Sequence, residues 1–181
     1  MSTALNWLSA LDHPEFLADR VSAALRQWPD GDAEAVQVAE IDPAIADTSA
    51  LVAATDITLE SSANCLVVRA RRSGTETLAA VLVLATTKAD INTAIRKTLG
   101  ARKCSFMSMD AAVEATGMEY GGITPIGLPQ DWPLLIDERV VAQDQIVIGS
   151  GVRRSKVRMP GPLAQQLPGA QVITDLAVPI A

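Results

Sequence analysis

The segment from Thr116 to Pro129, TGMEYGGITPIGLP, constrains the fold more than any other, because four glycines and two prolines fall within fourteen residues. Such a composition costs conformational entropy on folding unless the backbone needs geometries that other residues rarely adopt. Gly121 and Gly122 allow positive φ angles and the close approach of a ligand or another backbone, whereas Pro125 fixes φ and removes a donor. We therefore expect a loop of unusual backbone geometry, called the glycine loop below (residues 117–129).

Two interpretations of the glycine loop follow from its residues. Peptide groups held in a concave loop can bind a small polar group, such as an ester carbonyl or an α-amino group. The alternative is a structural loop that crosses the sheet. The segment is neither a GxGxxG motif nor a P-loop, and no Lys-Ser/Thr pair follows it, so binding of nucleotide phosphates is not indicated.

Short helices and strands are predicted on both sides of this loop. Helices are expected over residues 12–28, 48–55, 90–99, 109–115 and 162–167, with Asp90 as a cap and Gly100 and Gly117 as stops. Strands are expected over residues 35–41, 104–107, 134–137, 145–148, 156–159 and 171–174. Residues 63–69 and 77–85 form a predicted hairpin around Arg71-Arg72-Ser73-Gly74.

The order of these elements indicates the fold class. Helices and strands are mixed without a strict βαβ alternation, which favours an α+β fold with a mixed, mostly antiparallel sheet or partial barrel and surrounding helices. A length of 181 residues suits one domain with a short appendage. We predict an N-terminal helical extension over residues 1–30 and a main domain over residues 31–181.

Composition bears on the environment of the chain. Hydrophobic residues make up 49% and aromatic residues 3%, so the core is expected to consist of Ala, Val, Leu and Ile. The longest strongly apolar run, Leu78–Ala85, is far shorter than the roughly 20 residues that a membrane-spanning helix needs. The first residues also lack the charged and apolar regions of a secretory signal. We expect a cytoplasmic protein with no membrane partner.

Charge and metal-ligand content limit the function. The net charge of −6 argues against broad, non-specific binding of nucleic acid. Two basic clusters are either phosphate sites or solvated strand edges and loops. The first consists of Arg69, Arg71 and Arg72, and the second of Arg153, Arg154, Lys156 and Arg158. The two cysteines, Cys65 and Cys104, form no CxxC motif, and His13 is the only histidine. We therefore predict no metal site and no other cofactor.

The motif GGITPIG, Gly121–Gly127, resembles the GG-I-S/T-P-hydrophobic-G signature of the YbaK/ProX-type aminoacyl-tRNA editing domains. Flanking features agree in order. Leu99-Gly100 is followed by Ala101-Arg102-Lys103, a predicted helix precedes the glycine loop, and an acidic residue, Asp137, ends a strand. IVIGSGVRRSKVRMPGPL, from Ile146 to Leu163, resembles the family's glycine turn, basic pair and last helix start. The resemblance covers roughly residues 48–176 and implies the fold of the prolyl-tRNA synthetase editing domain.

The resemblance also implies an activity and a site. Such a protein is a free-standing aminoacyl-tRNA deacylase, which hydrolyses the ester of mischarged tRNA (trans-editing) without a metal, with the terminal tRNA ribose hydroxyl aiding attack by water. The catalytic candidates are Asn64, Gly121 and Gly122. The candidates for binding substrate are Thr124, Pro125, Gly127, Gly149, Ser150, Gly151, Arg153 and Arg154. The glycine turn, Gly149–Gly151, faces the glycine loop across the pocket, and Arg153 and Arg154 meet phosphates of a tRNA acceptor end that carries a small amino acid.

Asn64 departs from the pattern, because the family usually has a lysine in this setting. Asn64 orients the ester in an altered site, or Lys88, Arg69 or another base supplies the charge, or catalysis has been lost. Asn64 can also be a strand-edge amide that satisfies a nearby backbone group. A catalytically impaired binding module of the same fold is therefore the rival to the deacylase. A hydrolase of another small ester or amide is a third hypothesis. No coiled coil or interface stripe is apparent, so no oligomeric state is predicted.

Overall fold

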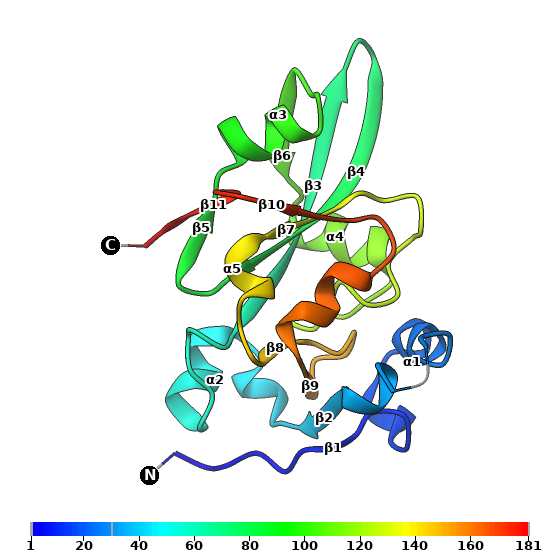
Figure 1. The fold of residues 1–181 in the computed structure, drawn as a ribbon, viewed down its shortest axis with the longest axis vertical. Coiled ribbons are helices and arrows are strands. Elements are labelled where there is room, and N and C mark those ends of the chain that lie inside the picture. The colour runs from blue at the N-terminus through cyan, green and yellow to red at the C-terminus, as the bar shows by residue number, and fades with distance from the viewer. Residues whose placement is uncertain (1, 30, 181) are drawn as a thin grey trace.

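The computed structural model describes residues 2–29 and 31–180, and within them the strands form three sheets (Figure 1). The largest has five strands in the order β10-β7-β4-β3-β6. These are β10 (Ala170–Ile173), β7 (Leu134–Asp137), β4 (Thr75–Leu84), β3 (Ala63–Arg72) and β6 (Lys103–Phe106). The strand β7 is parallel to β4 and β10, whereas β3 is antiparallel to β4 and β6.

The long β3–β4 hairpin turns at Ser73 and Gly74, which have φ angles of 49° and 83°. Positive φ at both central residues is the geometry of a two-residue hairpin turn whose twist matches its strands. The register pairs Arg72 with Thr75 and Ala63 with Leu84. The predicted hairpin is therefore confirmed, and both strands extend closer to the turn than the sequence indicated.

The second sheet has four antiparallel strands in the order β1-β2-β9-β8. They are β1 (Leu8–Ser9), β2 (Gln37–Glu40), β9 (Ser155–Met159) and β8 (Ile146–Gly149). An isolated bridge pairs Ser62, the residue before β3, with Val147 of β8. The two sheets therefore meet at one end of the hairpin. A third pair consists of β5 (Thr87–Ala89) and β11 (Ala177–Pro179).

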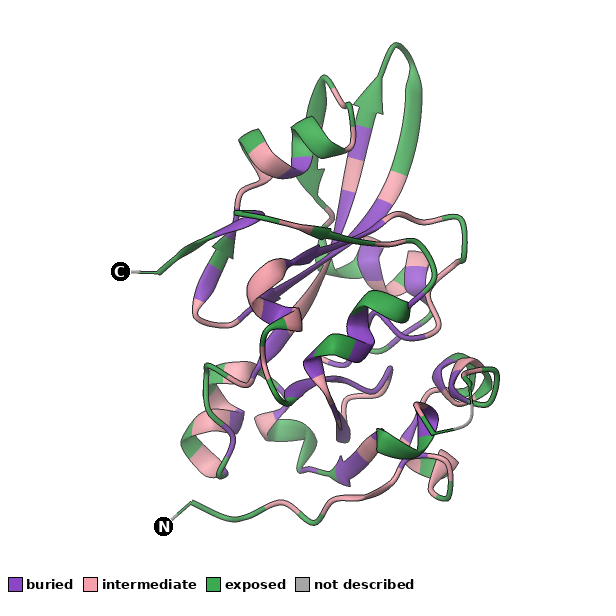
Figure 2. Cartoon of the chain, in the orientation of Figure 1, coloured by how far each residue is buried: buried purple, intermediate pink, exposed green. Residues whose placement is uncertain are grey.

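The main core lies between these sheets and is lined by alternate residues of their strands. Ala80, Leu82 and Leu84 of β4 belong to it, whereas Val81 and Val83 face a second core on the other side of the sheet. This is the two-residue period of a strand. Figure 2 shows the buried residues concentrated in the central strands, with the tip of the hairpin exposed.

Helices surround the sheets, and some of them begin or end at recognisable caps. They are α1 (Asp19–Leu25), α2 (Thr48–Ala54), α3 (Arg96–Thr98) after a π-helical turn (Ile91–Ile95), α4 (Met109–Thr116) and α5 (Glu138–Val141). Four 3-10 helices cover Pro14–Phe16, Ala33–Ala35, Pro43–Ile45 and Gly161–Gln166 in the described part of the chain. Asp90 accepts hydrogen bonds from the N–H groups of Thr93 and Ala94, and Gly117 ends α4 with a φ of 65°. Both features were predicted and are confirmed.

The predicted continuous helix over residues 12–28 is wrong. The chain forms the 3-10 helix at Pro14–Phe16, becomes extended at Leu17, and re-enters a helix at Asp19. The N–H of Ala18 donates to the carbonyl of Ser150 at 3.1 Å instead of to a helical partner. This long-range bond explains the break.

The α+β class with a mixed, mostly antiparallel sheet is confirmed. The division into a helical extension over 1–30 and a main domain over 31–181 stays a prediction, and Leu17, Val21 and Leu25 pack into the main core. Among the described residues, no helix combines the length and the apolar content that a membrane span requires.

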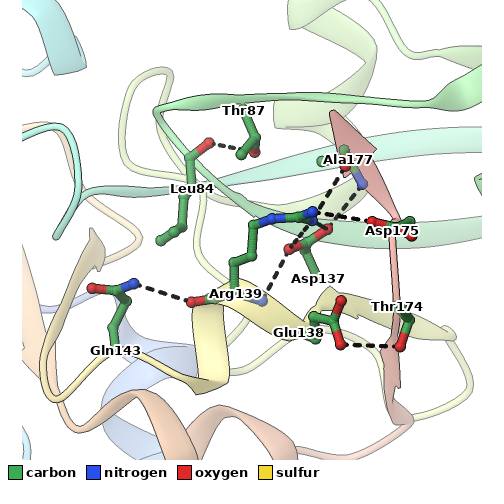
Figure 3. Close-up of polar contacts among 9 residues, drawn as sticks. All are labelled: Leu84, Thr87, Asp137, Glu138, Arg139, Gln143, Thr174, Asp175 and Ala177. Carbon is green, nitrogen blue, oxygen red and sulfur yellow. Dashed lines mark hydrogen bonds and ion pairs between the residues drawn. The ribbon is translucent and has the colours of Figure 1, made fainter. Parts of the chain in front are cut away.

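Asp137, the last residue of β7, joins three elements at the end of that strand (Figure 3). Its side chain is fully buried and accepts hydrogen bonds from the N–H of Ala177 at 2.9 Å and the N–H of Arg139 at 3.0 Å. The guanidinium of Arg139 contacts both oxygens of Asp137 and also pairs with Asp175 at 3.0 Å. The acidic strand end singled out by the sequence therefore fastens β7, α5 and the start of β11.

We expect Asp137→Ala to lower the free energy of unfolding by about 2–4 kcal/mol, because buried N–H groups lose their acceptor. Asp175→Asn is the matched control, since it removes an exposed negative charge from the same guanidinium, keeps a side chain that tolerates the positive φ of 54° there, and should change stability little. Urea denaturation of both variants measures the difference. Equal effects of the two substitutions would contradict this account of Asp137.

Candidate functional site

A cavity of about 250 Å³ lies where the two larger sheets meet. Its walls come from α2, the start of β3, the glycine loop and the facing ends of β8 and β9, which lie close together in Figure 1. The polar or glycine residues that line it are Asp47, Thr48, Ser62, Asn64, Gly121, Gly149 and Lys156. This volume lies just below the range of about 300–1,000 Å³ that is typical of ligand pockets.

The glycine loop and the glycine turn cross in direct backbone contact beside this cavity. A Cβ atom on Gly149 would lie 2.3 Å from the carbonyl oxygen of Gly122, and one on Gly122 would lie 2.5 Å from that of Val152. The N–H of Gly151 donates to the carbonyl of Gly122 at 2.7 Å. Glycine is needed here because the two backbones pack against each other, so the loop crosses the sheet and also lines a pocket.

Lys156 is the cation of the cavity. It pairs with Gly149 in the β8–β9 register, is 7% exposed, and donates from Nζ to the carbonyl of Gly121 at 3.0 Å. Burial lowers the pKa of Lys156 from 10.5 to about 8, with Arg153 adding to the effect and Asp47 opposing it. An ammonium has three donors, so one bond to Gly121 leaves two for a ligand.

Asn64 lines the cavity from β3. Its Oδ1 accepts a hydrogen bond from the hydroxyl of Thr48, the first residue of α2, at 2.9 Å. This bond holds the amide in place and leaves its Nδ2 as the group that can donate to a ligand. Asn64 is half-buried, and its amide is satisfied in part by a side chain rather than by nearby backbone.

Arg153 forms the rim of the cavity together with Tyr120 and Asp47. Its guanidinium lies over the Tyr120 ring, 4.8 Å from the centroid, and donates to the Tyr120 carbonyl at 3.3 Å. It is also 3.7 Å from the Asp47 carboxylate. Its backbone N–H donates to Glu119 at 2.6 Å. These contacts fix the mouth of the cavity between α2 and the glycine loop.

The inner wall is apolar. Leu51, Leu66, Ile123 and Ile148 line the cavity together with Cys65, whose pKa is raised to about 12 by burial. A thiol with this pKa stays protonated at neutral pH and is a poor nucleophile. The cavity therefore combines an apolar wall with a few donors at one side, which suits a small ligand with one polar end.

The other predicted site residues lie away from this cavity. Pro125 and Gly127 line a separate cavity of about 410 Å³ against α1, together with Trp28 and Trp132. Thr124, within the glycine loop, is fully buried and does not line the cavity. The nearby glycine turn contributes Ser150, whose buried hydroxyl bonds to that of Ser155 at 2.7 Å.

Gly151 and Arg154 face the N-terminal segment instead. A Cβ on Gly151 would collide with the side chain of Ala18, and the exposed Arg154 donates to the carbonyl of Glu15. Among the predicted residues, the structure thus brings Asn64, Gly121 and Gly149 together at the cavity. Gly122 packs against the backbone of Gly149 beside the cavity, and Arg153 lies at the rim.

The sequence did not single out Lys156 for the cavity. The two named alternatives lie elsewhere, because Lys88 is exposed on β5 and Arg69 pairs with Glu76 at 3.1 Å. The sequence did hold a signal for Lys156. The predicted strands on either side of the glycine turn form a hairpin, and this hairpin places Lys156 opposite Gly149, where its side chain can lie over the glycine. Among the described residues, no cluster of three or more His, Cys, Asp or Glu side chains is arranged to hold a metal ion.

Comparison with known proteins adds a family and a fold. Residues 42–166 match the family model described as the aminoacyl-tRNA editing domain. A solved structure described as a candidate trans-editing enzyme for prolyl-tRNA synthetase is 21% identical, with a TM-score of 0.71 over 86% of this chain and 93% of that one. No curated protein sequence matches the chain.

Two further solved structures share the fold. A scaffold protein for computational grafting of epitopes is 22% identical, with a TM-score of 0.71 over 87% of this chain and 95% of that one. A hypothetical protein is 18% identical, with a TM-score of 0.69 over 86% and 99% of the two chains. At these identities the likeness shows the fold alone.

We expect Gly149→Ala to destabilise the protein by about 1–3 kcal/mol, because its Cβ would meet two backbone carbonyl oxygens that cannot easily move. Gly74→Ala is the control, since the space around Gly74 is open and only the positive φ costs energy. Chemical denaturation gives both values. A Gly149 variant as stable as the wild type would show that the crossing tolerates a methyl group.

Proposed function

The chain belongs to the aminoacyl-tRNA editing domain family, and from this premise we propose that it is an aminoacyl-tRNA deacylase that removes small amino acids from mischarged tRNA in trans. One observation carries the proposal. The buried ammonium of Lys156 lies in a small cavity with Asn64 and the glycine loop, where it can act on an ester carbonyl.

The reaction requires water to attack the carbonyl carbon of the ester that joins the amino acid to the terminal ribose. Negative charge develops on the carbonyl oxygen, the bond to the ribose oxygen breaks, and that oxygen takes a proton. Lys156 stabilises the developing charge with its free donors, since fixed donors act strongly where water is excluded. The Gly121 carbonyl holds the ammonium in position, which gives the glycine loop a direct role.

Asn64 orients the ester through Nδ2 while Thr48 holds its oxygen. The cation that the family usually places on β3 is supplied here by Lys156 from β9, the strand that reaches the same cavity from the other sheet. The side chain of the amino acid occupies the apolar wall. The volume of about 250 Å³ favours small groups such as alanyl, seryl or cysteinyl.

The rim residues bind the ends of the substrate. Asp47 is the carboxylate among the lining residues and accepts from the α-ammonium group. Arg153, held by Tyr120, meets the terminal phosphate of the tRNA. A cytoplasmic location and the absence of a metal requirement are part of the proposal.

The alternative of a catalytically impaired binding module rests on Asn64. An amide forms weaker hydrogen bonds than an ammonium, roughly half as strong per bond. If Lys156 did not act on the ester, Asn64 alone would bind substrate with little acceleration. The measured turnover of the wild-type protein separates the two functions.

The test is deacylation of tRNAs mischarged with Ala, Ser or Cys. We expect the wild type to release at least one of these amino acids, and Lys156→Met to lower kcat by about 10²–10³-fold, as for loss of a donor to the developing charge. Methionine fills a similar space without a buried charge, so the variant should fold. Lys88→Met, an exposed lysine on β5, is the control and should keep wild-type activity. A folded wild-type protein that deacylates none of these tRNAs would contradict the proposal.

The pH profile tests the protonation state of Lys156. Because its pKa lies near 8, below the usual 10.5, the ammonium is present below pH 8 and is lost above it. We expect the enzyme-catalysed rate, corrected for hydrolysis by hydroxide, to fall about tenfold per pH unit above pH 8. Lys156→Arg stays charged, so any activity it retains should not show this fall. A rate that rises through pH 8 would instead assign Lys156 as a base.

A further inference from the structure

The charge of this acidic protein is distributed very unevenly along the chain. Residues 69–103 hold eight of the 15 basic residues and two of the 21 acidic residues. This stretch therefore carries a net charge of +6, and the rest of the chain carries −12. Such asymmetry can direct an anionic partner to one region of a protein that repels it elsewhere.

The fold gathers most of these basic residues at one end. We call this surface the basic end and define it by Arg71 and Arg72 at the end of β3, Arg96 and Lys97 on α3, Arg102 just before β6, and Lys103 at the start of β6. Figure 1 shows the hairpin tip, α3 and β6 together at the end opposite to α2 and β9, and Figure 2 shows this end exposed. All six side chains are exposed.

Backbone contacts fix the strands and loop of the basic end relative to one another. Arg71 lies opposite Lys103 in the β3–β6 register, and its carbonyl accepts from the N–H of Arg102 at 2.9 Å. In addition, the guanidinium of Arg72 donates to the carbonyl of Gly100 at 3.1 Å. Two grooves of about 380 and 460 Å³ run between the hairpin tip and the loop before β6, and Arg71 and Arg72 line both. Glu76 pairs with Arg71 and offsets part of the charge.

We propose that the basic end binds the phosphodiester backbone of an RNA duplex, namely the acceptor stem of the tRNA whose 3′ end enters the cavity. The placement of that 3′ end rests on the proposed function. Asn64 and Arg71 lie on the same strand seven residues apart, which is about 23 Å at roughly 3.3 Å per residue. A stack of nucleotides about 3.4 Å apart spans this distance with about seven nucleotides. The basic end thus meets the first base pairs beyond the single-stranded 3′ end.

The chemistry of this surface favours RNA over a membrane. In the described part of the chain, the exposed large apolar residues are Leu59, Phe106, Met109, Tyr120, Val172, Val178 and Ile180, and none belongs to the basic end or lines its grooves. An amphipathic membrane-binding surface inserts such residues between lipids, whereas basic side chains alone make only an electrostatic contact with anionic headgroups. The grooves instead present the hydroxyls of Ser73, Thr75 and Thr77, which can donate to phosphates. Contacts to phosphates read the shape of an A-form duplex and not its sequence.

The test compares two double variants with the same change of charge. Arg102→Gln/Lys103→Gln neutralises the basic end at two side chains that are exposed and not needed for the cavity. Arg26→Gln/Lys88→Gln is the control, since these exposed residues lie directly after α1 and on β5. Binding of an RNA hairpin that has the acceptor-stem sequence but carries no amino acid is measured over a range of salt concentrations. Vesicles that contain anionic lipid and a single-stranded RNA ending in CCA are measured in parallel.

We expect the Arg102/Lys103 variant to bind the RNA hairpin at least about tenfold more weakly near 0.1 M salt, with a salt slope reduced by about two. The control should bind like the wild type. In deacylation, the Arg102/Lys103 variant should raise KM for aminoacyl-tRNA without changing kcat. Its activity on a short aminoacylated CCA fragment should be unchanged.

Three results would overturn the proposal. The first is an equal loss of hairpin binding in both double variants, which would reflect overall charge alone. The second is a loss of binding to anionic vesicles only. The third is unchanged binding of the RNA hairpin by the Arg102/Lys103 variant. The binding measurement uses RNA without an attached amino acid, so its result does not depend on deacylation. A protein without deacylase activity that still loses hairpin binding in the Arg102/Lys103 variant would refute the proposed activity and retain the RNA surface.

Discussion

The backbone crossing between the glycine loop and the glycine turn is the contact on which the rest of the site depends. Gly122 and Gly149 allow two segments about thirty residues apart to pack without side chains between them. The hydrogen bond from Gly151 to Gly122 closes this crossing. It fixes the Gly121 carbonyl beside the cavity, and it places β9 so that Lys156 reaches that carbonyl. The cost of ordering so many glycines is thus offset by a close approach that other residues would prevent.

The electrostatics of the cavity follow from this geometry. Lys156 is held in a site that disfavours its charge, and the carbonyl of Gly121 and the carboxylate of Asp47 compensate only in part. An ammonium with donors to spare in a buried site is prepared to receive developing negative charge. At the far end of the molecule the same sign of charge is carried by exposed side chains, which suits phosphates in water. In the proposed function, the two basic regions would therefore meet different parts of one substrate, the ester and the stem that carries it.

Much of this fold could be predicted, because local residues determine it. Ser73-Gly74 specified the hairpin turn, and Gly117 specified the end of α4. Features set by distant contacts could not be predicted in the same way. The break at Leu17 depends on a hydrogen bond to Ser150, and the position of Lys156 depends on which face of a five-residue strand is covered. The sequence of β9 alternates, and Val157 and Met159 do face the main core, with Lys156 on the other face. The alternation does not show that the glycine loop covers that other face and buries Lys156.

The central claim is that the cavity with Lys156 and Asn64 binds the aminoacyl end of tRNA. The most direct test is an NMR titration of the protein with an adenosine that carries alanine through a stable 3′-amide. The account predicts saturable shifts of the Lys156 Nζ and Asn64 Nδ2 signals, with Lys88 unaffected. It would be contradicted if these signals did not move, or if the ligand instead shifted the indole signals of Trp28 and Trp132, which line the second cavity.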